Sequence, residues 1–193
     1  MTSAPLAAAL RIGVILSLLD PIVALDRSVQ GAVQSARPQL PLERLMQGAT
    51  DVGRKDRLFG LLLVVAVFTG APGPQTAREC LLALIPATLT VDGIKRLVNR
   101  TRPDGETKPS NSSFPSSHAA GAFALATVFS RRWRRLWPLW FLAAALVASS
   151  RLYLNRHFLS DVVVGAMIGF GWAWAMARWV FDRALRGAVV SEE

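Results

Sequence analysis

The sequence contains few of the residues on which many functional sites are built. Its single cysteine, Cys80, cannot form a disulfide within the chain and gives no information on the redox compartment. Histidine occurs only twice, at His118 and His157. The 13 acidic residues are outnumbered by 22 lysines and arginines, and they form no cluster suited to magnesium. The chain also lacks internal repeats and low-complexity segments.

Apolar residues, by contrast, are abundant and are gathered into long runs. They make up 52% of the 193 residues, and the mean hydropathy is positive. Long apolar runs favour membrane helices over a soluble core, and the length fits one domain, 1–193. The net charge of +9 does not predict nucleic-acid binding, because the basic residues lie at the ends of the apolar runs, where they contact anionic headgroups.

Six apolar segments predict an all-α, polytopic membrane helix bundle with six transmembrane helices. They cover residues 6–25, 58–70, 77–99, 119–129, 136–149 and 162–181. The first contains Arg11, Asp20 and Pro21, so an interfacial helix or a signal peptide is an alternative to a span. The segment 26–57 reads as an amphipathic surface segment broken by prolines.

The last predicted span has a face of small residues, Gly165, Gly169, Ala173 and Ala177. Such a face allows close helix packing. It suits either packing within the bundle or a dimer, and the oligomeric state stays open.

The basic segment 131–135 lies between two predicted spans and indicates the orientation of the bundle. Short basic loops stay in the cytoplasm, so this hairpin is expected inside. The charged ends of the other spans then meet at the extracytoplasmic rim. With this orientation, several basic residues of the segment 26–57 are also expected on the extracytoplasmic side. This conflicts with a simple count of positive charge on the two sides of the membrane.

The segment 150–161 joins two apolar runs and contains Arg151, His157 and Asp161. If a helix opens near Asn155, the histidine and the aspartate lie on one face. The carboxylate can then accept the imidazole proton and leave the other nitrogen free to attack. Arg151 offers donors for an oxyanion such as phosphate. Alternatively, Arg151 and Asp161 form a structural ion pair at a helix end.

Two earlier segments contain residues suited to the same chemistry. Lys95 and Arg102 are seven positions apart, so on a helix they share a face and can reach one phosphate; snorkelling at a helix end is the alternative. Residues 112–118 precede an apolar helix and supply serines, a proline and His118. Free amides at a helix start attract anions. A capped helix with an idle histidine is the alternative here.

Taken together, the three segments resemble the signature motifs of the type 2 phosphatidic acid phosphatase family of membrane lipid phosphatases. The matching residues are Lys95-x6-Arg102-Pro103, Pro115-Ser116-Ser117-His118 and Ser150-Arg151-x5-His157-x3-Asp161. The resemblance extends from about Lys95 to Gly169, within a motif-bearing core at 77–181. Ser117 stands where the family usually has glycine. Because serine still supplies its amide, we expect altered phosphate-loop geometry without loss of activity.

The resemblance implies a role for each matching residue. His157 is the expected nucleophile, which forms a phosphohistidine and is oriented by Asp161, and His118 is the expected acid and base. The residues expected to bind the phosphate are Lys95, Arg102, Ser116, Ser117 and Arg151. No metal or other cofactor is implied, since cations and helix-terminal amides can neutralise the developing charge.

The function expected from the resemblance is hydrolysis of a lipid phosphate or diphosphate in the bacterial inner membrane, at a site facing the periplasm or exterior. Undecaprenyl diphosphate is the preferred substrate by analogy, and phosphatidylglycerophosphate and phosphatidate are alternatives. Two other functions stay open: a lipid phosphotransferase that uses the same phosphohistidine, and a non-catalytic lipid-binding protein with a degenerate site.

Overall fold

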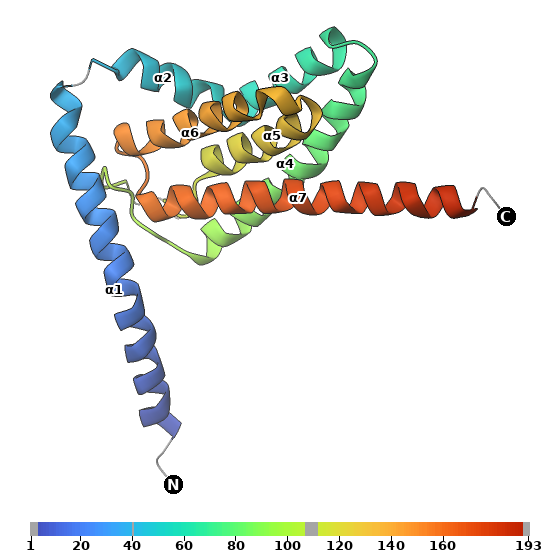
Figure 1. The fold of residues 1–193 in the computed structure, drawn as a ribbon. Helices are drawn as coiled ribbons and strands as arrows, with labels where there is room; N and C mark the ends of the chain where they lie inside the picture. Colours follow the sequence, from blue (N-terminus) through green and yellow to red (C-terminus); the bar gives the residue numbers. More distant parts are fainter. Residues whose placement is uncertain (1–3, 40, 107–111, 191–193) are drawn as a thin grey trace.

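The structure is a computed structural model that describes the backbone of residues 4–39, 41–106 and 112–190. Side chains are described at 20–38, 41–106 and 112–179. The described chain is helical, without strands, as the sequence predicts (Figure 1). Its α-helices are α1 (Ala4–Ala36), α2 (Glu43–Val52), α3 (Lys55–Phe68), α4 (Pro72–Leu97), α5 (Ser117–Arg132), α6 (Trp137–Tyr153) and α7 (Leu159–Val190).

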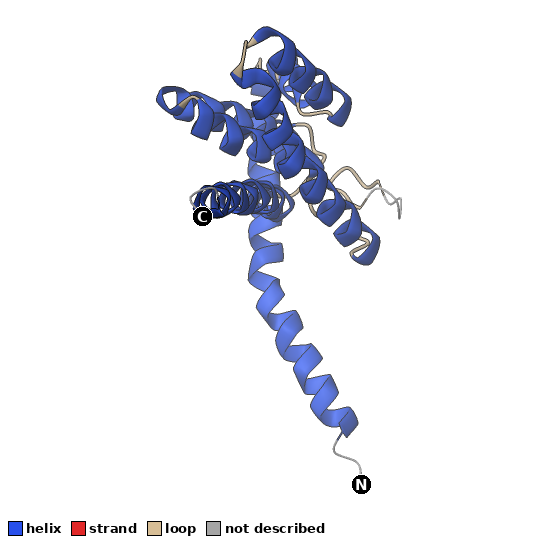
Figure 2. Ribbon diagram, turned by 90° about the vertical axis from the view of Figure 1, so that its right-hand side faces the viewer, coloured by secondary structure: helices blue, strands red, loops and turns tan. Residues whose placement is uncertain are grey.

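Each predicted span lies largely within one of these helices, and α2 is an additional short helix in the segment predicted to be amphipathic. The side chain of Met46 on α2 is buried, whereas Leu45 beside it is half exposed. Figures 1 and 2 show α1 projecting away from the remaining helices. Near its end, Gln30 and Gln34 of α1 donate to the carbonyl of Leu152 at 3.2 and 3.0 Å.

The helix α5 is the centre of the bundle, with α4, α6 and α7 packed around it. Most of its side chains are buried and small, so neighbouring helices approach its backbone closely. A β-carbon built on Gly165 of α7 would lie 2.4 Å from the carbonyl oxygen of Ser116, and one on Gly169 would lie 2.0 Å from that of Ala120. The small-residue face of the last helix therefore packs within the chain, against α5.

Within the described residues, two helical segments are long and apolar enough to cross a membrane, Arg134–Tyr153 and Leu159–Trp179. Large apolar side chains on the same helices face outward, for example Leu142 and Met167, both 66% exposed. Exposed apolar surface of this extent is typical of contact with lipid.

Candidate active site

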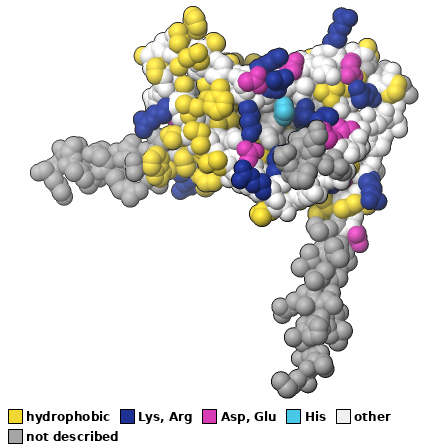
Figure 3. Space-filling model, turned by 180° about the vertical axis from the view of Figure 1, so that it is seen from behind, with side chains coloured by type: hydrophobic (Ala, Val, Ile, Leu, Met, Phe, Trp, Pro, Cys, Tyr) yellow, Lys and Arg dark blue, Asp and Glu magenta, His cyan; other side chains and the backbone are white. Residues whose placement is uncertain are grey.

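The residues of all three motifs meet at one cavity of about 260 Å³. It is lined by Gly53, Arg54, Lys55, Asp56, Lys95, Arg102, Ser117, His118, Arg151 and His157. Figure 3 shows a histidine on this face, surrounded by lysine and arginine side chains. Six of the eight predicted site residues therefore line the cavity, together with residues of the α2–α3 turn. The other two, Ser116 and Asp161, do not line it and are fully buried.

Three of the lining cations are almost fully buried. Lys95, Arg102 and Arg151 are 9, 6 and 8% exposed. The ammonium group of Lys95 donates to the carbonyl of Ser112 at 2.6 Å, and Nη1 of Arg102 donates to the carbonyl of Arg156 at 2.9 Å. Burial, together with the nearby charge of Arg156, lowers the pKa of Arg102.

Arg151 is only partly satisfied by the protein. Its Nη1 donates to the hydroxyl of Thr50 on α2, whereas its buried Nε has no hydrogen-bond partner among the described residues. A buried charged donor without an acceptor is costly. An anion in the cavity that Arg151 lines would relieve this cost, so the residues fit a phosphoryl group.

Arg102 lies in the loop after α4, which corrects the prediction that it shares a helical face with Lys95. The helix ends at Leu97, five residues before the arginine. The loop instead pairs with the segment before α5, because Ser113 donates its amide to the carbonyl of Arg100 at 2.9 Å. The two cations therefore reach the cavity from different elements.

The neighbours of His157 determine which of its nitrogens bears the proton. Its Nδ1 lies 2.8 Å from the carbonyl oxygen of Ser113, which can only accept, so Nδ1 is protonated. Its Nε2 lies 3.5 Å from Nη1 of Arg102, which can only donate. In the neutral imidazole Nε2 is thus unprotonated, as a nucleophile requires.

Burial also keeps this imidazole neutral. His157 is 2% exposed, and burial lowers its pKa from 6.5 to about 4 despite the opposing effect of Asp161. The nearby charges of Arg151 and Arg102 act in the same direction as burial and contribute to this value. At pH 7 the side chain is therefore uncharged and able to attack phosphorus.

Asp161 holds the polypeptide around His157 rather than accepting the proton of its ring. The carboxylate Oδ2 is 3.6 Å from Nδ1 of the histidine, farther than the carbonyl of Ser113. It accepts the hydroxyl of Ser113 and the amide of Phe158, the latter at 2.8 Å. Because α7 begins at Leu159, and not near Asn155 as predicted, His157 lies in the preceding loop.

The start of α5 places the second histidine. Ser116 caps the helix, because its hydroxyl accepts the amide of Ala119 at 3.4 Å, and its own amide donates to the carbonyl of Asp161 at 2.9 Å. Ser117 and His118 follow in the first turn and line the cavity. A β-carbon on Gly53 would lie 2.5 Å from Cγ1 of Val147 and 3.0 Å from Cδ2 of His118, so a larger residue in the α2–α3 turn would have to displace these side chains.

Arg100 is a site residue that the sequence did not predict. Its Nη1 donates to Asp161 at 2.6 Å and to the hydroxyl of Ser160 at 2.8 Å. Its Nη2 donates to the buried carboxylate of Asp26 on α1 at 2.7 Å, and Asp26 also accepts the amide of Ser160 at 2.8 Å. The one feature of the sequence that pointed to this network is Asp26 itself, a carboxylate directly after the first apolar run.

Comparison with known proteins confirms the resemblance derived from the motifs. The family model of the PAP2 superfamily matches residues 76–185. A decaprenylphosphoryl-5-phosphoribose phosphatase of Mycobacterium tuberculosis is 35% identical over 152 residues, which cover 74% of this chain and 83% of that protein. A lipid A 1-phosphatase of Porphyromonas gingivalis is 37% identical over 100 residues, 50% of this chain but only 22% of that protein.

Solved structures show the same fold. The crystal structure of Aquifex aeolicus LpxE has a TM-score of 0.70 and 28% identity, and the match covers 80% of this chain and 95% of LpxE. A transmembrane PAP2-type phosphatidylglycerolphosphate phosphatase from Bacillus subtilis also has a TM-score of 0.70, at 22% identity, over 92% of this chain and 96% of that one. The second likeness concerns the fold alone.

The hydrogen bonds of Arg100 to Asp26 and Asp161 connect α1 to the loop that contains His157. A substitution on α1 is therefore expected to slow catalysis. Asp26→Asn removes the charge that holds Arg100, so Asp161 and the loop of His157 shift, and kcat for phosphate release is expected to fall about tenfold with little change in KM. Asp20→Asn, at an exposed position of the same helix, is the control and should keep the wild-type kcat. A wild-type kcat for Asp26→Asn would contradict this role.

The low pKa of His157 can be measured directly, because the chain has only two histidines. In His118→Asn the one remaining imidazole is that of His157, and its NMR titration midpoint is expected near pH 4 in the folded protein. The same protein unfolded in denaturant should titrate near 6.5, since burial no longer disfavours the cation. A folded-state midpoint between 6 and 7 would show that the ring is not desolvated.

Proposed function

Because the chain belongs to the PAP2 superfamily, we propose that it is a membrane phosphatase that hydrolyses a lipid phosphate or diphosphate through a phosphohistidine at His157. The observation that supports this most strongly is that Arg151, whose buried Nε has no partner among the described residues, lines one cavity with two further buried cations, Lys95 and Arg102. A phosphoryl group supplies the acceptors that this donor and the neighbouring cations require.

The proposed reaction has two displacement steps. In the first, Nε2 of His157 attacks phosphorus, the bond from phosphorus to the leaving oxygen breaks, and protonated His118 donates a proton to that oxygen. Burial, with the nearby charges of Arg151 and Arg102, lowers the pKa of His118 to about 3, so this acid form depends on the negative charge of the bound phosphoryl group. In the second, His118 removes a proton from water, the resulting oxygen attacks phosphorus, and the phosphorus–nitrogen bond breaks. The proton on Nδ1 stays shared with the carbonyl of Ser113, which stabilises the positive ring of the intermediate.

The phosphate oxygens are assigned to Lys95, Arg102, Arg151 and Ser117, all of which line the cavity. Three cations in a buried site stabilise negative charge strongly, and no metal is needed for this purpose. Ser116 has a supporting role in this proposal, because its amide and hydroxyl already form the bonds that cap α5 and bind the backbone of Asp161.

An apolar groove beside the cavity supports a lipid as the substrate. It has a volume of about 200 Å³ and lies between the α2–α3 turn and the helices α5 and α6. Its lining residues are Val52, Gly53, Leu58, Leu61, Ala122, Leu125, Ala126, Phe129, Trp140, Ala143, Ala144 and Val147. Gly53 lines both the groove and the cavity, so a phosphate and its hydrocarbon chain can lie in them together.

A polyprenyl phosphate or diphosphate is the substrate class that we favour, with undecaprenyl diphosphate as the first compound to test. A relative that this chain covers over 83% of its length is named for a decaprenyl-linked phosphate. A relative from Sulfolobus acidocaldarius is named an undecaprenyl-diphosphatase, with 38% identity over 33% of this chain. We further propose six membrane spans in the inner membrane, with the cavity at the extracytoplasmic rim and the turn 131–135 in the cytoplasm.

Phosphate release in detergent tests this function. Wild-type protein with excess chelator is expected to release phosphate from undecaprenyl diphosphate faster than from phosphatidylglycerophosphate or phosphatidate. His157→Ala should lose at least about a thousandfold in kcat, because it removes the proposed nucleophile. Full activity in His157→Ala, or no release by wild type from any of the three, would refute the proposal; an unchanged elution profile shows that the variant folds.

The groove predicts a separate effect on lipid binding. Ala143 and Ala145 are both exposed on α6, but only Ala143 lines the groove. Ala143→Trp should raise KM for a long-chain lipid phosphate about tenfold by filling the space for the chain, without affecting hydrolysis of water-soluble p-nitrophenyl phosphate. Ala145→Trp should leave both reactions unchanged. Equal KM values for the two variants would place the lipid chain elsewhere.

A further inference from the structure

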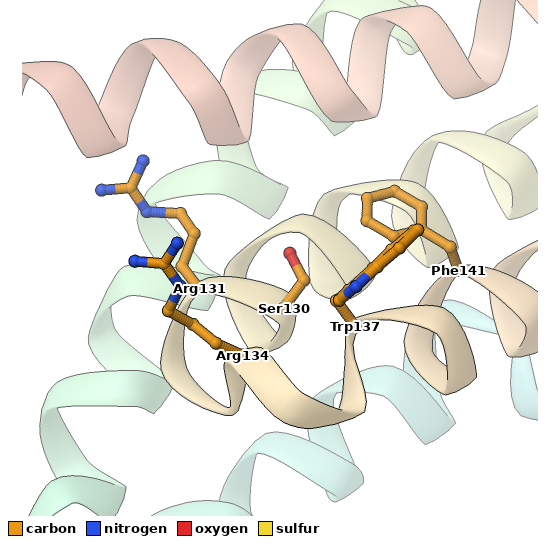
Figure 4. A pocket seen from close by; sticks show the side chains of 5 residues that line it. All are labelled: Ser130, Arg131, Arg134, Trp137 and Phe141. Carbon is orange, nitrogen blue, oxygen red and sulfur yellow. The ribbon is translucent and has the colours of Figure 1, made fainter.

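A second cavity, of about 530 Å³, lies at the turn between α5 and α6. It is lined by Ser130, Arg131, Arg134, Trp137 and Phe141. Figure 4 shows the two guanidinium groups on one side, the two aromatic rings on the other and the serine between them. The cavity is therefore divided into a cationic half and an apolar half.

This cavity is distinct from the catalytic one. His118 lies in the first turn of α5 and Arg131 in its last, and Arg151 lies in the last turn of α6 and Trp137 at its start. At 1.5 Å per residue these pairs are separated by about 20 Å along the helices. The two cavities thus lie at opposite ends of the same helix pair.

The cationic half has no anionic partner among the residues whose side chains are described. Arg131 and Arg134 take part in none of the ion pairs between described residues, and both are exposed. The sequence contains no aspartate or glutamate from residue 107 to residue 160. Two unpaired guanidinium groups side by side repel each other, and an anion between them would remove that repulsion.

The apolar half lies where a lipid chain would begin. Trp137 and Phe141 form a T-shaped pair with ring centroids 6.4 Å apart, and Trp137 is 58% exposed. Both belong to the start of the membrane-crossing segment Arg134–Tyr153, where aromatic rings contact the region between headgroups and hydrocarbon. A soluble anion would use the arginines and leave this apolar wall uncovered.

We propose that this cavity binds an anionic phospholipid, with its phosphate diester between Arg131 and Arg134 and its hydrocarbon chain along Trp137 and Phe141. The lipid belongs to the leaflet opposite the one at which the catalytic cavity opens. The hydroxyl of Ser130 donates to the carbonyl of Thr127 at 2.8 Å, so its oxygen can still accept a hydrogen bond. A headgroup that bears hydroxyls, such as phosphatidylglycerol, satisfies this oxygen and the two arginines together.

The matched variants are two double substitutions that remove the same charge. Arg131→Gln/Arg134→Gln changes the cavity, whereas Arg132→Gln/Arg135→Gln changes neighbouring exposed arginines that do not line it. Binding of phosphatidylglycerol to the full chain in detergent is measured by native mass spectrometry, with phosphatidylcholine of the same chains and soluble glycerol 3-phosphate as comparisons. Elution profile and thermal midpoint show that both variants fold.

The cavity pair is expected to weaken phosphatidylglycerol binding at least fivefold, and the neighbouring pair less than twofold. Phosphatidylcholine should bind weakly to all three proteins, and millimolar glycerol 3-phosphate should not displace the lipid. Equal losses in the two variants would indicate diffuse charge attraction and overturn the proposal. So would wild-type affinity in the cavity variant, equal binding of phosphatidylcholine, or displacement by glycerol 3-phosphate.

Discussion

Lys95, Arg102 and Arg151 are buried around one small cavity, where like charges repel and lose their hydration. The protein offsets only part of this cost, through the carbonyls of Ser112 and Arg156 and the hydroxyl of Thr50. An imidazole held neutral among them adds no further positive charge. An anion in the cavity would offset the rest of this cost, so the affinity for phosphate that we propose follows from how the cations are buried.

The rest of the structure holds this arrangement in place. The small residues of α5, and the glycines of α7 that contact its backbone, bring the segment before α5 against the loop that contains His157. Asp161 then ties the two loops together through Ser113, and Arg100 extends the network to Asp26 on α1. A helix that contributes no motif residue is in this way coupled to His157, the proposed nucleophile. At the opposite ends of α5 and α6, the turn between the two helices forms the cavity lined by Arg131, Arg134, Trp137 and Phe141.

Much of this arrangement could be predicted from the sequence, because apolar runs and the spacing of three motifs are local signals. The helices were located this way, as were six residues that line the cavity. Contacts between distant elements leave no such signal, which is why Arg100, Thr50 and Gly53 were missed. The placement of Arg102 on a helix was wrong, since the periodicity gave no sign that the loop after Leu97 pairs with the segment before α5. The acceptor at Nδ1 of His157 is a backbone carbonyl, and no sequence pattern marks a carbonyl.

Trapping of the covalent intermediate is the sharpest test of the proposed two-step reaction. Wild-type protein is mixed with undecaprenyl diphosphate labelled in its terminal phosphate, quenched in alkali within milliseconds and digested for mass spectrometry. One labelled residue is expected, phosphohistidine at position 157, and its label disappears when excess unlabelled substrate is added before the quench. Label on His118 or on any other residue, or phosphate released at the wild-type rate without any labelled protein, would contradict it.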